Sequence, residues 1–507
     1  MAKPSSLADY PVFARRTLIA AAVFFAVSFA GLWFLEGPFP GDAGRLKNFS
    51  RLIPPDLLIS DAWYGVYLDG NYIGYAHSAM RARELDEGGG YVLATRAALK
   101  LPMLAFQEDL TIDGQTILDK NYELESADFG FKAGSYFINS RLRRIRARVF
   151  ENRISTPSGA SVKTVTLSRQ MVNFSASPLL LSYLPLKDKV SFSFLDPILD
   201  KNTEVRITRG PETFIELSGA RQKVRALALD VEGVTGTLYV DEKGNLLRQD
   251  FLGIRLIKEE PAALFKKKAR AGPEDFYERF SLPAVDAAGK PVAIGAAAGL
   301  KALKIKISGI DRSFFINDHN QKADPVSGMV EIQKSVVPAT AGRLPFDTKD
   351  LAAFTREEES IMFKANGVAQ KAVQIAGDET DAFKVTTRVF DWVDKNIQKL
   401  PTLSLPSAGD TLRMGRGDCG ELSALTVGLL RALGLPAYVN IGVVYHAGRF
   451  FYHAWVSVWV GGWIDIDPAL SQLIADPTHI KLGRGPKSQA ELFKLIDRMK
   501  IEVVEYD

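Results

Sequence analysis

The chain has little cysteine and little histidine. Cys419 is the single cysteine among 507 residues, so no intramolecular disulfide can form. Its thiol is therefore either buried or a reactive group of a functional site. Four of the five histidines show no spacing typical of zinc ligands, namely His77, His319, His446 and His479. We therefore expect no metal ion and no cofactor, and we interpret His479 as a structural residue at the border of the site described below.

The chain also lacks a strong net charge. Its formal charge of +4 at pH 7 gives no argument for nucleic-acid binding. Basic residues do gather in two short clusters, which we interpret as solvated strand or linker faces, with contact to anionic lipid or cell-wall polymer as the alternative. The clusters are Arg141, Arg143, Arg144, Arg146 and Arg148, and Lys266, Lys267, Lys268 and Arg270.

Long uncharged runs are rare. The run from Thr17 to Leu35 is long enough to span a bilayer, and no later segment reaches that length. Arg15 and Arg16 precede it, which favours a cytoplasmic N-terminus. A cleaved signal peptide is the alternative, because Ser28-Phe29-Ala30 would serve as a cleavage site. Apolar residues that continue to Leu35 favour the anchor, so we expect a single-pass membrane protein with its bulk on the periplasmic side.

Cys419 lies at the start of a predicted helix. Asp418 is a good N-cap, and Glu421 stands where the acidic residue of a capping box belongs. Leucines follow at three- and four-residue steps, and Gly434 then stops the pattern, which predicts a helix over 419–433. The positive end of the helix dipole lies at the first turn and stabilises the negative charge of a thiolate there. It therefore favours the nucleophilic form of the thiol.

Three β-type runs follow the helix, at 437–445, 449–460 and 463–466, and they predict an antiparallel meander. His453 lies on the second run, and Asp467 follows the third, directly before a proline. An imidazole can accept the proton of the Cys419 thiol, and a carboxylate can orient the imidazole. The order of these residues on helix, strand and strand therefore indicates a Cys-His-Asp triad.

The triad constrains the last hairpin. A two-residue loop at Gly461-Gly462 would pair Val456 with Asp467, which places His453 and Asp467 on opposite faces of the sheet. The two side chains can meet only if the loop holds three residues, 460–462, or if a bulge interrupts the strand. The sequence therefore predicts one of these two irregularities.

These segments resemble the transglutaminase-like superfamily, whose papain-like cysteine peptidase fold is shared by transglutaminases, peptide N-glycanases and many bacterial proteases. The resemblance implies that Cys419 is the nucleophile, His453 the base and Asp467 the orienting carboxylate, with Asp465 as second choice. Tyr438 departs from the family pattern, because many relatives have arginine at that position. The matching segments are Gly417–Glu421, Leu429–Ala437, Tyr452–Val456 and Gly462–Pro468.

The expected fold class is α+β: a transmembrane helix, a β-rich domain and a C-terminal transglutaminase-like domain. Short β-type runs separated by glycine, asparagine and aspartate turns indicate the β-rich domain. A stretch rich in alanine, glycine, proline and lysine indicates a linker. The expected divisions are a cytoplasmic N-terminus at 1–16, an anchor at 17–35, a β-rich extracytoplasmic domain at 60–258, a linker at 259–300, a β segment at 301–345, the transglutaminase-like catalytic domain at 350–485 and a C-terminal tail at 486–507.

The expected function is thiol acyl transfer on an amide bond of a protein or peptide substrate associated with the cell envelope. The Cys419 thiolate would attack the carbonyl carbon, His453 would protonate the leaving amine, and the Cys419 backbone N–H would donate to the oxyanion. Water as the acceptor makes a cysteine peptidase or amidase, whereas an amine makes a cross-linking transglutaminase. Hydrolysis needs no second pocket and is the default. The alternative of another class is a non-catalytic binding or scaffold protein that keeps the fold.

Overall fold

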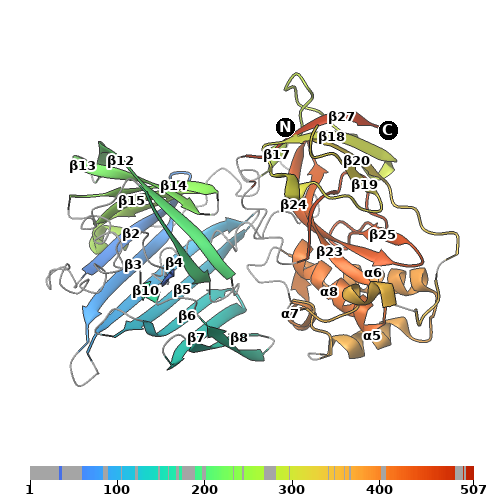
Figure 1. Cartoon of the computed structure of the whole chain (residues 1–507), viewed down its shortest axis with the longest axis horizontal. Helices are drawn as coiled ribbons and strands as arrows, with labels where there is room; N and C mark the ends of the chain where they lie inside the picture. The colour runs from blue at the N-terminus through green and yellow to red at the C-terminus, as the bar shows by residue number, and fades with distance from the viewer. Residues whose placement is uncertain are drawn as a thin grey trace. The chain divides into compact units, whose positions relative to one another are not determined.

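The structure is a computed structural model, and its described residues fall into an N-terminal unit that ends at Asp275 and a C-terminal unit that begins at Phe276 (Figure 1). The described residues are 34–36, 60–83, 89–103, 106–119, 124–146, 149–157, 159–166, 171–173, 189–196, 201–217, 219–231, 233–242, 245–267, 281–295, 297–340, 342–346, 349–358, 360–364, 367–400, 407–485, 495 and 498–507.

Strands dominate the described part of the chain, with 54% of the described residues in strands and 18% in helices. The expected α+β class is therefore wrong, and the chain is mostly β. The cause lies in the N-terminal unit, where the expected short β-type runs are long strands, up to the 17 residues of β12 (Lys201–Leu217). Because these strands build one large sheet, their residues far outnumber those of the helices near Cys419.

The expected transmembrane helix is also corrected. Residues 1–33 lie outside the described residues, and Phe34–Glu36 forms strand β1, which pairs with β10 (Met171–Asn173). Within the described ranges, no helix is both long and apolar enough to cross a bilayer. The apolar residues Phe34 and Leu35 fit a strand as well as a helix, because periodicity does not separate the two over so short a stretch.

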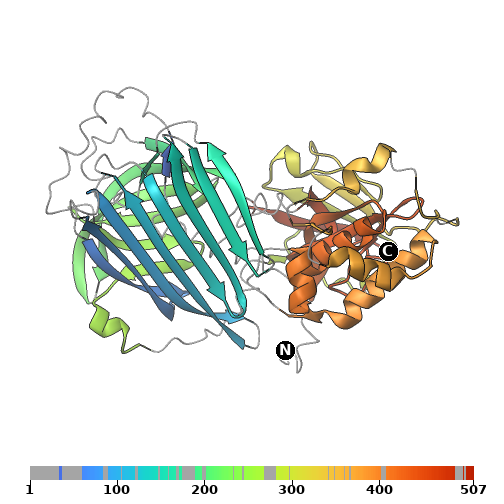
Figure 2. The ribbon, with the colours of Figure 1, turned by 90° about the horizontal axis from the view of Figure 1, so that it is seen from below.

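The sheet of the N-terminal unit has 14 strands, in the order β11-β12-β13-β14-β15-β16-β2-β3-β4-β5-β6-β7-β8-β9. Two antiparallel meanders meet where β16 pairs with β2. Figure 2 shows that the sheet curves until its two halves face each other. The remaining bounds are β2 Ser60–Leu68, β3 Asn71–Ala82, β4 Tyr91–Met103, β5 Phe106–Leu118, β6 Leu124–Ala133, β7 Tyr136–Arg146, β8 Val149–Thr156, β9 Gly159–Thr166, β11 Lys189–Asp196, β13 Ala220–Val231, β14 Val234–Val240, β15 Leu246–Phe251 and β16 Ile254–Lys258.

Side chains in this unit alternate between core and solvent along the strands. On β6, Phe129 and Phe131 are buried, and on β7 the buried residues are Ile138 and Leu142. Four residues of the first arginine cluster lie on β7 and Arg148 lies outside the described residues. Arg141 and Arg143 pair with Asp128, and Arg144 pairs with Asp119. Lys267 of the second cluster pairs with Glu259. These contacts fit the interpretation of the clusters as solvated faces.

Within its described residues, the C-terminal unit combines a five-stranded sheet with the four α-helices α5 to α8. The sheet order is β17-β24-β23-β26, and β25 pairs with the other part of β24. Helix α8 contacts β23, β24 and the three other helices, and all its residues from Cys419 to Arg431 are buried. The bounds are β17 Leu282–Pro283, β23 Ala437–His446, β24 Arg449–Trp459, β25 Trp463–Ile466, β26 Ile480–Arg484, α5 Val368–Ala376, α6 Ala382–Asn396, α7 Ala408–Met414 and α8 Cys419–Ala432.

A second sheet of this unit has the order β19-β20-β18-β27. The expected C-terminal tail supplies β27, which pairs with β18, and the expected linker contains α3 and β17, one in each unit. The bounds are β18 Ala302–Ser308, β19 Gln321–Ala323, β20 Met329–Gln333, β27 Lys500–Tyr506, the two short strands β21 Gln398–Lys399 and β22 Arg416–Gly417, helix α3 Pro261–Leu264, and the 3-10 helices η5 Ala297–Gly299, η6 Arg312–Phe314 and η7 Lys349–Phe354.

Candidate active site

Cys419 is the first residue of α8, as the capping pattern predicts. The Asp418 side chain accepts a hydrogen bond from the Gly420 backbone N–H at 3.1 Å, and the Glu421 side chain accepts one from the Asp418 N–H at 3.4 Å. Gly417 must be small, because a Cβ there would lie 2.5 Å from the Glu421 Cβ. The Cys419 side chain is buried, with 2% of the residue exposed. The helix cap thus fixes the thiol at the positive end of α8.

The hairpin between β24 and β25 has the three-residue loop that a triad requires. Trp459 pairs with Trp463, so residues 460–462 form the loop, and Gly461 has a positive φ of 105°. Ser457 then pairs with Asp465. By the alternation of strands, His453 and both aspartates share one face of the sheet. The prediction of an irregular hairpin is confirmed, in its three-residue form.

Asp467 accepts hydrogen bonds through both of its carboxylate oxygens. His453 Nε2 lies 2.7 Å from Oδ2, and Oδ1 accepts from the backbone N–H groups of Ala469 and Leu470 at 2.8 and 3.2 Å. Burial opposes ionisation of Asp467, but His453 and His479 outweigh it and hold the pKa of this carboxyl below its ordinary value. The pair is therefore a buried carboxylate hydrogen-bonded to an imidazole.

Asp465, the second choice, has other partners. Its carboxylate accepts from Ser457 Oγ at 2.5 Å and from Asn320 Nδ2 at 3.0 Å, and its Oδ2 lies 2.8 Å from Lys481 Nζ. Of the two aspartates, Asp467 is therefore the one that contacts His453. Asp465 belongs to a different cluster on the same sheet face.

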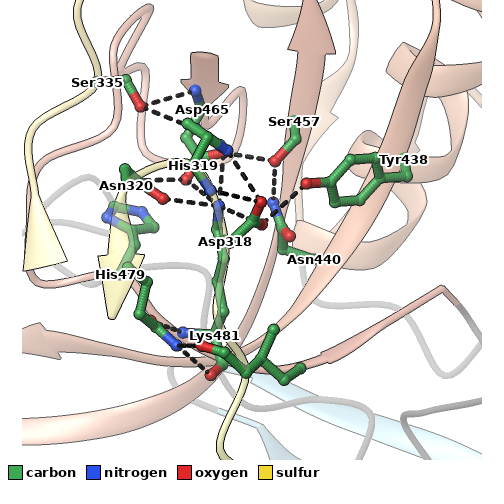
Figure 3. Close-up of polar contacts among 12 residues, drawn as sticks. Asp318, His319, Asn320, Ser335, Tyr438, Asn440, Ser457, Asp465, His479 and Lys481 are labelled. Atoms are coloured by element: carbon green, nitrogen blue, oxygen red, sulfur yellow. Dashed lines mark hydrogen bonds and ion pairs between the residues drawn. The ribbon is translucent and has the colours of Figure 1, made fainter. Parts of the chain in front are cut away.

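This buried ion cluster consists of Asp318, Asp465 and Lys481, and Figure 3 shows it with its polar neighbours. Lys481 Nζ lies 2.8 Å from Asp318 Oδ2, and 1% of its side chain is exposed. Burial opposes ionisation of Asp318, but His319 and Lys481 outweigh it and lower the pKa of this carboxyl. The cluster joins the turn before β19 to the sheet that carries His453.

Tyr438 belongs to the surroundings of this cluster. Its hydroxyl donates to Asp318 Oδ2 at 2.9 Å, and the Arg484 guanidinium lies 5.1 Å from the centre of its ring. Burial raises the pKa of Tyr438, so the phenol stays neutral and donates. The positive charges beside the sheet face therefore come from Lys481 and Arg484 of β26, while Tyr438 supplies a hydroxyl.

The sequence analysis interprets His479 as a structural residue, but the structure places it in contact with Asp467. Its Nε2 lies 3.0 Å from Asp467 Oδ2, the same oxygen that His453 contacts, and its Nδ1 lies 2.9 Å from the backbone oxygen of Asp476. Burial lowers the pKa of His479, but Asp467 and Asp476 outweigh it and raise the pKa to about 10. An aspartate three positions before a histidine, directly after the triad strands, is the sequence signal that marks this residue.

One atom each of His453, Asp467 and His479 lie within 4.8 Å of one another, a donor set that a metal ion also uses. The two hydrogen bonds to Asp467 Oδ2 already account for these atoms. A cation would have to displace the proton of His479, whose pKa is raised. The geometry therefore fits a hydrogen-bonded charge network better than a metal centre.

Comparison with protein families identifies the domain that contains this network. Residues 369–468 match the model of the transglutaminase-like superfamily, and they include Cys419, His453 and Asp467. This stretch is a transglutaminase-like domain. The resemblance drawn from the four sequence segments is confirmed, and the transglutaminase-like domain comprises helices α5 to α8 and strands β23 to β25.

The chain is also similar to several bacterial proteins. An uncharacterized protein of Mycobacterium leprae (strain TN) is 25% identical over 183 residues, which are 33% of this chain and 64% of that protein. A solved structure from Cytophaga hutchinsonii, named as a candidate cysteine protease, is 16% identical with a TM-score of 0.27 and covers 41% of this chain and 87% of its own. A β-barrel-like protein from Brucella abortus is 10% identical with a TM-score of 0.30, over 40% of this chain and 96% of its own.

Proposed function

We propose that the transglutaminase-like domain is a thiol acyl-transfer enzyme that hydrolyses an amide bond of a peptide or protein. Cys419 is the nucleophile, His453 the base and Asp467 the carboxylate that orients it. The contact that carries the proposal is the 2.7 Å hydrogen bond between His453 and Asp467 inside a buried site. This contact is the second half of a nucleophile, base and orienting-acid arrangement.

A serine links the start of α8 to the strand that carries His453. The Ser423 hydroxyl lies 2.6 Å from the Cys419 backbone oxygen and 3.2 Å from the Ala454 backbone oxygen. Ser423 is fully buried, so water does not compete for these contacts. The hydroxyl therefore ties the residue of the nucleophile to the residue directly after the base, which supports their action as a pair.

The proposed reaction has two steps. The Cys419 sulfur bonds to the carbonyl carbon while the thiol proton passes to His453, and the imidazolium then gives that proton to the departing amine, leaving a thioester. His453 next takes a proton from water while the water oxygen attacks the thioester carbon, and it returns that proton to the departing Cys419 thiolate as the carboxylic acid is released. Asp467 holds Nε2–H of His453 throughout, so Nδ1 is the nitrogen that exchanges protons with thiol, amine and water. The Cys419 backbone N–H donates to the oxyanion.

Because Cys419 is the single cysteine, alkylation with iodoacetamide reports on this thiol alone. We expect the native protein to react at pH 6 to 7, well below the ordinary thiol pKa of about 8.5, and to lose this reactivity in His453→Gln. Denatured protein serves as the reference for an ordinary thiol. A native thiol that reacts only as the denatured one does would favour the scaffold alternative.

Substitution of the nucleophile tests the chemistry itself. We expect Cys419→Ser to lower hydrolysis of a peptide library by about three orders of magnitude or more, because a hydroxyl does not ionise as a thiol does. The melting temperature, measured on the same preparation, should stay within a few degrees of the wild-type value. Products are identified by mass spectrometry with and without an added amine, so transamidation appears as an amine adduct. Full activity in Cys419→Ser would refute the proposal.

We also propose that the bulk of the chain is periplasmic and that its substrate is associated with the cell envelope. Both proposals rest on the apolar run and the paired arginines near the N-terminus. Cell fractionation with an antibody against the chain measures the location directly. Recovery of the chain in the cytosolic fraction would contradict it.

A further inference from the structure

Asp467 has every acceptor position of its carboxylate occupied. Oδ1 accepts from two backbone N–H groups, of Ala469 and Leu470, and a backbone amide can only donate. Oδ2 lies 2.7 Å from His453 Nε2 and 3.0 Å from His479 Nε2. No acceptor in this set needs a proton from Asp467, so the group is a carboxylate that receives hydrogen bonds from two histidines.

His479 faces acceptors at both ends of its ring. Nδ1 lies 2.9 Å from the Asp476 backbone oxygen and 3.4 Å from its carboxylate, and Nε2 faces the Asp467 carboxylate. A carbonyl oxygen and a carboxylate can only accept, so both ring nitrogens must carry a proton to satisfy these contacts. A ring protonated at both nitrogens is an imidazolium, and the geometry alone assigns this state to His479.

The surroundings of His479 hold the ring in this position. Its side chain is 1% exposed, and the Trp455 ring packs edge-on against it with centroids 5.1 Å apart. Asp476 is fixed in turn by Thr478 and Gln472. Among the described residues, the charged groups in contact with His479 are therefore Asp467 and Asp476, and the His453 ring lies 5.7 Å away.

We propose that His479 is a positioning residue: as an imidazolium it holds the Asp467 carboxylate by a second hydrogen bond and reduces the negative charge that His453 experiences. The proposal rests on the proposed function, in which His453 exchanges protons with Cys419. A positive charge at His479 repels a proton on His453 and so opposes the effect of Asp467. His453 consequently remains available as a neutral base nearer to neutral pH than it would be beside an unshared carboxylate.

Two variants separate the hydrogen bond from the charge. In His479→Gln an uncharged amide N–H can still donate to Asp467, whereas His479→Ala removes both the donor and the charge. His77→Gln is the matched control, because it removes a histidine that also contacts an aspartate, at 2.7 Å from Asp61, in the other unit. All measurements use the full chain, and a melting curve accompanies each variant.

The first measurement is the ring 15N NMR spectrum of the histidines at pH 8. We expect the His479 signals of the wild-type protein to show two protonated nitrogens. This readout involves no reaction of Cys419, so it stands even if the protein proves not to be an enzyme. A neutral His479 ring at pH 8 would overturn the proposal, and this outcome does not depend on whether any variant folds.

The second measurement is the pH at which His453 loses its proton, followed by NMR and by the pH profile of Cys419 alkylation. We expect this pH to rise by at least one unit in both His479→Gln and His479→Ala, and to stay unchanged in His77→Gln. A folded His479→Gln protein whose His453 titrates as in the wild type would overturn the proposed charge effect. An inert Cys419 thiol in the wild type, with the NMR result intact, would instead refute the proposed function.

Discussion

At the scale of the residue, Asp465 on β25 and Asp467 directly after it have different partners. Asp467 forms a hydrogen bond with His453, and Asp465 forms an ion pair with Lys481, although only one residue separates the two aspartates in the chain. Both are fully buried on the same sheet face. The two aspartates differ in the side chain that each one contacts. The sequence alone could not decide which of them contacts His453.

Their substitution by asparagine should give opposite patterns. We expect Asp467→Asn to lower peptide hydrolysis by about 10² to 10⁴, because asparagine presents His453 with the wrong hydrogen-bond pattern. We expect Asp465→Asn to cost about 3 to 5 kcal/mol of unfolding free energy, because it leaves the buried Lys481 charge underpaired. Hydrolysis rates and urea unfolding curves of both variants check this. Equal losses of activity and stability in the two variants would contradict the division of tasks.

The raised pKa of His479 predicts how stability depends on pH. The folded protein keeps the His479 proton up to a pKa of about 10, whereas the unfolded chain loses it near 6.5. The stabilisation is therefore complete below pH 6.5 and declines as pH rises toward 10, by up to about 1.4 kcal/mol per pH unit. Urea unfolding between pH 7 and 9 measures this decline. His479→Gln should lack it, and parallel curves for the two proteins would be the contrary result.

At the scale of the element, Gly442 lets β26 approach β23 at the active site. It pairs with His453 on one side and with Lys481 on the other, next to a register shift. A Cβ at this position would lie 1.8 Å from the Ile480 backbone oxygen and 3.1 Å from the Trp455 ring. Because Ile480 precedes Lys481 and follows His479, this close approach positions both side chains.

We expect Gly442→Ala to destabilise the C-terminal unit by about 1 to 3 kcal/mol and to slow alkylation of Cys419, because β26 must move away from β23. Gly295→Ala is the control, since a Cβ there meets nothing within 4 Å. Melting curves and alkylation rates of the two variants give the test. A Gly442→Ala protein that melts and reacts as Gly295→Ala does would show that the close approach is unimportant.

Some elements follow from the sequence because their signals are local. The capping box at Asp418 and Glu421 predicts where α8 begins, and the requirement that His453 and an aspartate share a face predicts the irregular hairpin. Other features depend on distant pairs. Asp318 and Lys481 lie 163 positions apart, and β27 at the C-terminus finds its partner β18 near residue 305. No periodicity of either segment shows its partner, so the sequence predicted the β segment at 301–345 but neither its pairing with β27 nor the buried cluster.

At the scale of the whole molecule, the chain combines a 14-stranded antiparallel sheet with a unit that holds all the candidate chemistry. Every residue of the His453 network and of the buried ion cluster belongs to the C-terminal unit. The cluster joins the four-stranded and the five-stranded sheet of that unit, because Asp318 lies just before β19 and Lys481 lies on β26. The unit should therefore lose its two-sheet packing when the cluster is broken, while the N-terminal unit is unaffected.

Calorimetry of the full chain can detect this independence. We expect Lys481→Met to lower the melting transition of the C-terminal unit by on the order of 10 °C, because it leaves Asp318 and Asp465 buried without their shared cation. The transition of the N-terminal unit should keep its temperature. Lys322→Met, at an exposed position of β19, is the matched control and should change neither transition. A Lys481→Met protein in which both transitions fall together would mean that the two units unfold as one, and the assignment of the cluster's stabilising effect to the C-terminal unit alone would then be wrong.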